Sequence, residues 1–204
     1  KQSKLYFDRP LSNIVFMGMG EPMMNYKNVV DAIKKITEED GLGMSPRRIT
    51  VSTSGIPKMM KMLADENLKV KLALSLHSAI EHKRNEIMPF STKFPLTEIM
   101  DAMQYWYEKT GNRVTFEYCV WKGINDGDED IKALIKYCRQ VPCKVNLIQY
   151  NPIGEGKFDH RSVEAEEKYV RELEKAGITA LVRRSRGGDI DAACGQLANK
   201  NSGE

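Results

Sequence analysis

Apolar and polar residues alternate along this chain in blocks that predict strands and helices in turn. Short apolar runs rich in β-branched residues are typical of buried strands, and six are expected, at residues 13–17, 48–53, 70–76, 114–120, 144–150 and 178–182. Apolar residues at helical spacing predict five helices between them, at residues 28–37, 56–67, 96–109, 129–139 and 164–176. This alternation favours a parallel α/β fold, either a doubly wound sheet or a (β/α) barrel.

Composition adds few constraints. The chain has 204 residues, of which 41% are hydrophobic and 29% charged, as expected for a globular domain with a substantial core. A net charge of +3 is too small to indicate a nucleic-acid partner by itself. No apolar run approaches the roughly 18 residues of a membrane span, so no membrane partner is expected. Four cysteines are too few for a disulfide scaffold, which predicts a cytoplasmic location.

Small, hydroxylic, amide or acidic residues follow every predicted strand. The segments are Gly18-Met19-Gly20-Glu21-Pro22, Ser52-Thr53-Ser54-Gly55, Ser75-Leu76-His77-Ser78, Gly123-Ile124-Asn125-Asp126, Tyr150-Asn151-Pro152-Ile153-Gly154 and the stretch from Arg183 to Leu197. One such loop would be ordinary turn chemistry. The carboxyl ends of parallel strands share one rim, where ligands bind, so six such loops predict a binding site.

The last of these segments surrounds Cys194 with small residues and follows a cluster of arginines. Nearby guanidinium groups favour the thiolate, so this cysteine is a candidate nucleophile. On base rates alone, a small buried packing residue is the simpler interpretation.

Other candidates have plain alternatives. His77 has no acidic partner in the pattern, so a core histidine is simpler than a general base. The segment Gly18-Met19-Gly20 lacks the third glycine of a dinucleotide-binding fingerprint. A zinc site built from Cys119, Cys138 and Cys143 would lack a fourth ligand.

Three basic groups are candidates for phosphate contacts at the rim, with solvated surface charge as the alternative. They are Arg47-Arg48, Lys83-Arg84 and Arg183-Arg184-Ser185-Arg186.

Together, these segments resemble the RlmN/Cfr family of radical-SAM RNA methyltransferases. The matching residues are Gly18-Met19-Gly20-Glu21-Pro22, Arg47-Arg48 with Ser52-Thr53-Ser54-Gly55, Ser75-Leu76-His77, Tyr150-Asn151-Pro152 and Asp189-Ile190-Asp191-Ala192-Ala193-Cys194-Gly195-Gln196-Leu197. The first is shared loosely among radical-SAM enzymes, whereas the last is highly specific. The likeness extends from about residue 13 to residue 197.

The resemblance implies a partial parallel (β/α) barrel of the radical-SAM type, without its first strand and cluster loop. Residues 1–198 would form this truncated domain together with the carrier-cysteine segment, and residues 199–204 a disordered tail. Gly20 and Glu21 would hold the amino group of S-adenosylmethionine. Ser52, the segment of Ser75, Leu76 and His77, and Asn151 would contact the rest of the cofactor, and Cys194 would carry a methyl group.

The family's mechanism implies two uses of S-adenosylmethionine. One molecule methylates the carrier thiolate. A 4Fe-4S cluster, reduced by a donor such as flavodoxin, cleaves a second to a 5′-deoxyadenosyl radical that abstracts a hydrogen from the S-methyl group. The methylene radical then adds to carbon 2 of an adenine in 23S rRNA, and in tRNA for dual-specificity members. A disulfide with a second cysteine releases the product.

One departure from the family pattern limits this expectation. The chain contains no C-x3-C-x2-C motif, so it provides no cluster ligands in that form. We therefore expect a fragment of a longer enzyme, inactive alone, with the motif and second cysteine upstream of Lys1. Three alternatives are a carbon-8 methyltransferase of the same family, a non-catalytic cofactor- or RNA-binding barrel module, and another kind of radical-SAM enzyme. The segment around Cys194 argues against the last of these.

Overall fold

The computed structural model describes residues 11–18, 20–148 and 163–183. Within these ranges, six strands form one parallel sheet in the order in which they follow along the chain. They are β1 (Ile14–Phe16), β2 (Ile49–Thr53), β3 (Lys71–Ser75), β4 (Val114–Tyr118), β5 (Cys143–Ile148) and β6 (Ala180–Arg183). Each overlaps a predicted strand.

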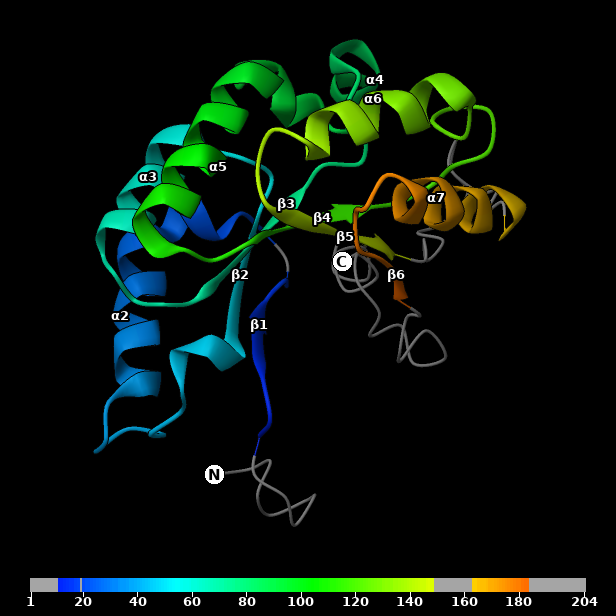
Figure 1. Cartoon of the computed structure of the whole chain (residues 1–204). Helices are drawn as coiled ribbons and strands as arrows, with labels where there is room; N and C mark the ends of the chain where they lie inside the picture. Colours follow the sequence, from blue (N-terminus) through cyan, green and yellow to red (C-terminus); the bar gives the residue numbers. More distant parts are fainter. Residues whose placement is uncertain (1–10, 19, 149–162, 184–204) are drawn as a thin grey trace, which may run out of the picture.

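The helices lie along one side of this curved sheet (Figure 1). They are α2 (Tyr26–Thr37), α3 (Pro57–Asp65), α4 (Glu81–Ile87), α5 (Leu96–Thr110), α6 (Asp128–Cys138) and α7 (Val163–Lys175). Short 3-10 turns occur at Pro22–Asn25, Pro46–Arg48 and Pro89–Lys93. A doubly wound sheet reverses its strand order and carries helices on both faces, so the architecture is that of a partial (β/α) barrel.

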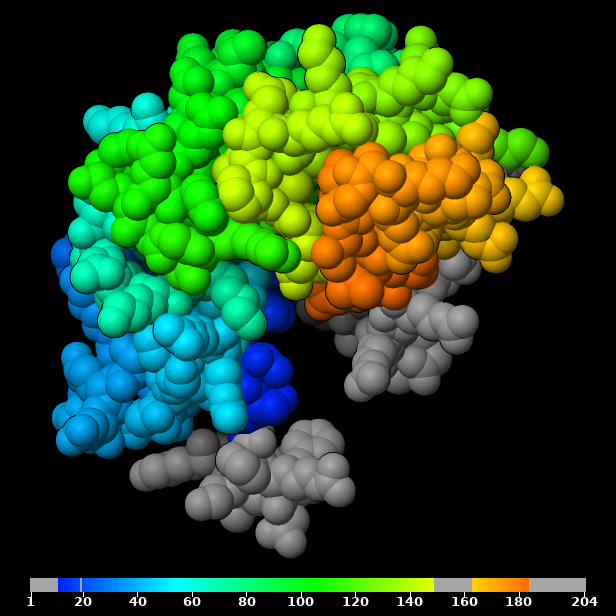
Figure 2. Space-filling model, in the orientation of Figure 1, coloured from blue at the N-terminus to red at the C-terminus, as the bar shows by residue number. Residues whose placement is uncertain are grey.

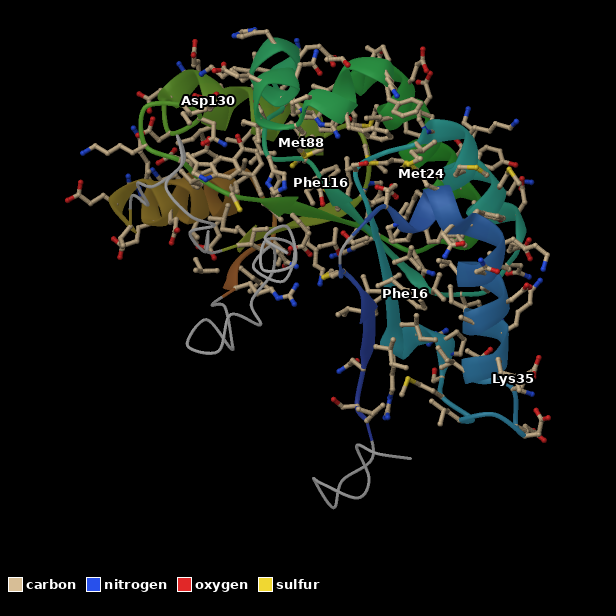
Figure 3. All side chains as sticks on the ribbon, turned by 180° about the vertical axis from the view of Figure 1, so that it is seen from behind. Phe16, Met24, Lys35, Met88, Phe116 and Asp130 are labelled. Atoms are coloured by element: carbon tan, nitrogen blue, oxygen red, sulfur yellow. The ribbon has the colours of Figure 1, made fainter. Side chains whose placement is uncertain are left out.

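The core lies between the sheet and the helices. On β4, Phe116 and Tyr118 are fully buried in the apolar cluster shared with the helices, and Figure 3 labels Phe116 on that side. The green, yellow and orange segments that contain α5, α6 and α7 form one continuous surface in the upper part of Figure 2, whereas the blue segment of β1 is visible below it. No helix in the described ranges is long and apolar enough to cross a membrane.

The alternating strand residues point to the concave face instead, and many of them are polar or small. The register places Ser52 beside Ala73, and Ser75 beside Glu117, which pairs in turn with Asn146. A row of hydrogen-bonding side chains therefore crosses from β3 to β5 on the face away from the helices.

Helix α4 was not predicted. Its sequence, Glu-His-Lys-Arg-Asn-Glu-Ile, has no apolar stripe, because the one fully buried side chain in it is Arg84. Hydrophobic periodicity cannot detect a helix that buries a guanidinium group.

The loop after β2 packs tightly against α5. Gly55 has φ +99°, and a Cβ there would lie 2.8 Å from Cδ1 of Ile99 and 3.0 Å from Cδ1 of Leu74. Glycine at this position allows both the positive φ and the close approach of the strand end to the helix.

Candidate functional site

Glu21 joins the loops that follow the first two strands. Its Oε2 accepts hydrogen bonds of 2.7 Å from both the backbone N and the Oγ of Ser54. Its Oε1 accepts a 3.0 Å bond from the backbone N of Met23 and so caps the following 3-10 turn. The carboxylate is partly buried and fixed in place, with the adjoining Gly20 at φ +85°. Glu21, the residue predicted to hold an amino group, is therefore preorganised at the carboxyl ends of the strands.

Arg84 links the carboxyl ends of β2 and β3 by hydrogen bonds from α4. This fully buried guanidinium donates from Nη2 to the carbonyl oxygen of Ser54 at 2.5 Å and to that of Ser75 at 3.4 Å. Its Nε and Nη1 have no hydrogen-bond partner in the described part of the chain. Arg84 and Glu21 therefore both hydrogen-bond to Ser54, Arg84 to its carbonyl oxygen and Glu21 to its backbone N and Oγ.

The structure separates the predicted cofactor-contact residues into two groups. Ser52 and Ser75 are partly buried and lie on the concave face, in register with Ala73 and Glu117 respectively. The side chain of Leu76 belongs to the core on the helical side. Leu76 can therefore meet a ligand on the concave face only through its backbone.

His77 adopts φ +56°, and its Nδ1 accepts a 3.1 Å hydrogen bond from the backbone N of Cys119. The ring proton consequently resides on Nε2. Burial, and secondarily the Arg84 guanidinium, lower the pKa of His77 from 6.5 to about 4. The residue is a neutral hydrogen-bonding group near pH 7 that holds the third and fourth strand ends together.

Asn125 completes the link between these two loops. Its Nδ2 donates to the carbonyl oxygens of His77 at 2.6 Å and Cys119 at 2.8 Å, and its Oδ1 accepts from the backbone N of Trp121 at 2.7 Å. The side chain is fully buried. Four consecutive strand-end loops are thus joined by Glu21, Arg84, His77 and Asn125.

Glu117 is a further polar group on the concave face, only 4% exposed. Its Oε1 accepts a 2.9 Å hydrogen bond from Nδ2 of Asn146, whereas its Oε2 is buried and has no hydrogen-bond partner among the described residues. Burial raises the pKa of Glu117, and Asn146, Arg183 and Lys144 partly offset that effect. Sequence reasoning missed this residue, although it is the one charged residue in the predicted strand at residues 114–120.

Two of the predicted phosphate-binding groups are wrong. Arg47 and Arg48 precede β2, so they lie at the amino end of the strand, away from the rim. Arg84 is buried, and Lys83 is engaged by Asp130 at 2.9 Å and by Glu129.

At the end of the last strand, Arg183 is exposed at the carboxyl end of β6, and its Nη1 lies 3.4 Å from Sδ of Met17 beyond β1. It therefore remains a candidate for phosphate contact.

Cys194 and Asn151 lie outside the described residues, as do Arg184 and Arg186. Cys119 and Cys138 are buried and Cys143 is partly buried, and no group of three or more potential metal ligands occurs in the described ranges. These ranges therefore do not fit an iron–sulfur cluster.

The concave face does fit S-adenosylmethionine in chemical terms. A fixed carboxylate at Glu21 suits an ammonium group, hydroxyl groups follow at Ser52 and Ser75, and the Oε2 of Glu117, which has no partner among the described residues, suits a further donor.

Comparison with known proteins agrees with this geometry. The family model of the radical SAM superfamily matches residues 1–138. A probable dual-specificity RNA methyltransferase RlmN from Flavobacterium psychrophilum is 64% identical over 98% of the chain, and one from Cytophaga hutchinsonii is 49% identical over 96%. The chain spans 58% and 53% of the lengths of these two relatives.

Solved structures show the same likeness. A radical SAM methyltransferase from Sphaerobacter thermophilus has 42% identity and a TM-score of 0.92, over 96% of this chain and 57% of that one. A domain of a pyruvate-formate lyase-activating enzyme from Bacteroides vulgatus, at 16% identity and a TM-score of 0.64, covers 85% of this chain and shares the fold.

Proposed function

Because this chain belongs to the radical SAM superfamily and, within it, to the RlmN/Cfr family, we propose that it is the cofactor-binding barrel of an RNA methyltransferase acting on carbon 2 of adenine. The observation that carries the proposal is the fixed carboxylate of Glu21 at the rim, in a chain 64% identical to a probable RlmN. The proposed substrates are 23S rRNA and tRNA, in the cytoplasm, with a flavodoxin-like electron donor.

In this proposal the residues at the strand ends bind and orient S-adenosylmethionine. Glu21 accepts hydrogen bonds from the ammonium group, while Gly20 lets the backbone approach it. Ser52, Ser75 and the backbone of Leu76 and His77 contact the remainder, together with Asn151. When bound, the cofactor supplies both the methyl group and the radical chemistry that an unreactive adenine carbon requires.

Cys194 is proposed as the methyl carrier, which places a nucleophilic thiolate on the chain itself. The target adenine has to leave its base stack to reach such a site, and basic residues such as Arg183 would contact the RNA backbone. Since the described residues do not fit a cluster, we assign no step of the reaction to one, and we propose that these 204 residues alone do not methylate RNA.

The test uses the protein expressed from its complete reading frame, with iron and sulfide reconstitution, reductant, S-adenosylmethionine and rRNA or tRNA. Mass spectrometry of the digested RNA should reveal 2-methyladenosine, and Cys194→Ala and Glu21→Gln should each reduce it at least 100-fold. 8-Methyladenosine would favour the carbon-8 alternative. An unmodified RNA with a fully reconstituted protein, or turnover by the 204 residues alone, would contradict the proposal.

A further inference from the structure

The burial of the Glu117 carboxylate is energetically unfavourable, and its contacts within the protein do not compensate for it. Glu117 is 4% exposed, and Asn146 donates to Oε1, but Oε2 is buried and has no hydrogen-bond partner within residues 11–18, 20–148 and 163–183. A buried carboxylate oxygen that has lost its water and gained no donor destabilises the fold. Lys144 and Arg183 influence it electrostatically, yet no ion pair joins either of them to Glu117 among the described residues.

Asp130 shows what a structural carboxylate looks like in the same protein. It is 2% exposed, and Nζ of Lys83 lies 2.9 Å from both of its oxygens. The backbone N of Gly127 donates to Oδ2 at 3.2 Å. Two equally buried carboxylates therefore differ in one respect, because Asp130 has donors for both oxygens and Glu117 lacks one.

The strand register places the Glu117 side chain beside the proposed cofactor contacts. Glu117 pairs with Ser75, a proposed cofactor contact, on one side and with Asn146 on the other. Adjacent strands lie about 4.8 Å apart, so a ligand resting on Ser75 reaches Glu117. Glu21 occupies the opposite end of this face, near β1 and β2, where the ammonium group is proposed. Glu117 is therefore left for the other end of an extended ligand.

We propose that Glu117, held in position by Asn146, binds an adenosine, its Oε2 accepting a hydrogen bond from a ribose hydroxyl or the exocyclic amino group. A carboxylate repels phosphate, so the bound portion is the nucleoside and not the backbone. The inference rests on the proposed function, in which both the cofactor and the target nucleotide carry an adenosine. An adenosine offers the same hydrogen-bond donors in both molecules, and the experiment below distinguishes the cofactor from the target nucleotide.

The test substitutes Glu117→Gln in the reconstituted protein from the complete reading frame. The amide keeps the shape but presents an NH2 group toward the ligand's donor. Calorimetry with S-adenosylhomocysteine, and with a short single-stranded RNA containing one adenosine, measures both affinities. If the cofactor is the source, the dissociation constant for S-adenosylhomocysteine rises at least tenfold. If the target is the source, that constant stays unchanged and the RNA binds at least tenfold more weakly.

Stability supplies the second readout. Without ligand, Glu117→Gln should unfold at the same or a higher temperature, whereas Asp130→Asn should unfold at a lower one, since it breaks a satisfied ion pair. Marked destabilisation by Glu117→Gln would assign the residue to structure and overturn the inference.

Glu21→Gln distinguishes the two proposals. If it weakens S-adenosylhomocysteine binding while Glu117→Gln leaves both affinities unchanged, only the inference about Glu117 fails. If the unaltered protein does not bind S-adenosylhomocysteine, or Glu21→Gln has no effect on that binding, the proposed function fails and the inference with it.

Discussion

At the scale of single residues, His77 illustrates how the fold uses a group that sequence reasoning first considered as a base. The ring accepts a hydrogen bond from the Cys119 backbone at the end of β4, and its carbonyl oxygen accepts one from Asn125. Protonation of Nδ1 would destroy the first of these bonds. The histidine is therefore suited to positioning a loop near neutral pH, which agrees with its lowered pKa.

This pKa predicts how stability depends on pH. The pKa is 6.5 in the unfolded chain and about 4 in the folded one, so the stabilising effect is complete above pH 6.5 and declines as pH falls toward 4. His77→Asn keeps an oxygen acceptor, tolerates positive φ and removes the titration. Between pH 7.5 and 5.0, urea unfolding should show the unaltered protein losing up to about 2 kcal/mol more than the variant.

The matched control is the exposed His82, for which the substitution His82→Asn should retain the unaltered pH dependence. Equal slopes for the unaltered protein and the His77→Asn variant would show that His77 does not titrate differently in the two states.

At the scale of secondary-structure elements, α4 acts as a brace behind the rim. Arg84→Ala removes the hydrogen bonds to the Ser54 and Ser75 carbonyls and leaves a cavity, so we expect a loss of about 2–4 kcal/mol in the free energy of unfolding. Chemical denaturation measures this directly. Arg139→Ala, at the exposed end of α6, should stay within about 0.5 kcal/mol of the unaltered protein. Similar losses in both variants would mean that Arg84 does not brace the strand ends.

The same helix marks the limit of what the sequence could predict. Elements with an apolar face, such as α5 and β4, were identified because their core positions recur at the helix or strand period. Arg84 and Glu117 are both buried, yet their residue types are those of a surface. Their roles depend on which strand lies beside which, and periodicity contains no such information.

At the scale of the whole molecule, the order of the strands decides where a ligand can bind. The alternation of strands and helices allowed either a doubly wound sheet or a barrel. The resemblance favoured the barrel, and the sequential strand order confirms it. The helices lie on one side of the sheet (Figure 1), and the strand register places Ser52, Ser75 and Glu117 on the other side. The strand-end loops containing Glu21, Ser54, Ser75 and His77 were thus predicted as a group, but the hydrogen bonds between them were not.

This arrangement predicts an uneven distribution of local stability across the sheet. All five residues of β4 are buried and both of its neighbours pair with it, whereas β1 and β6 each pair on one side among the described strands. Val15 is 48% exposed on β1, and Leu181 is 53% exposed on β6. Native-state hydrogen exchange should therefore be slowest for amides of β3 and β4, and at least about 100-fold faster at both edges, because edge strands open without disrupting the core. Uniform protection across all six strands would indicate that the edges are covered in solution by other parts of the protein, and comparison of the 204-residue chain with the complete reading frame would then identify which edge is covered.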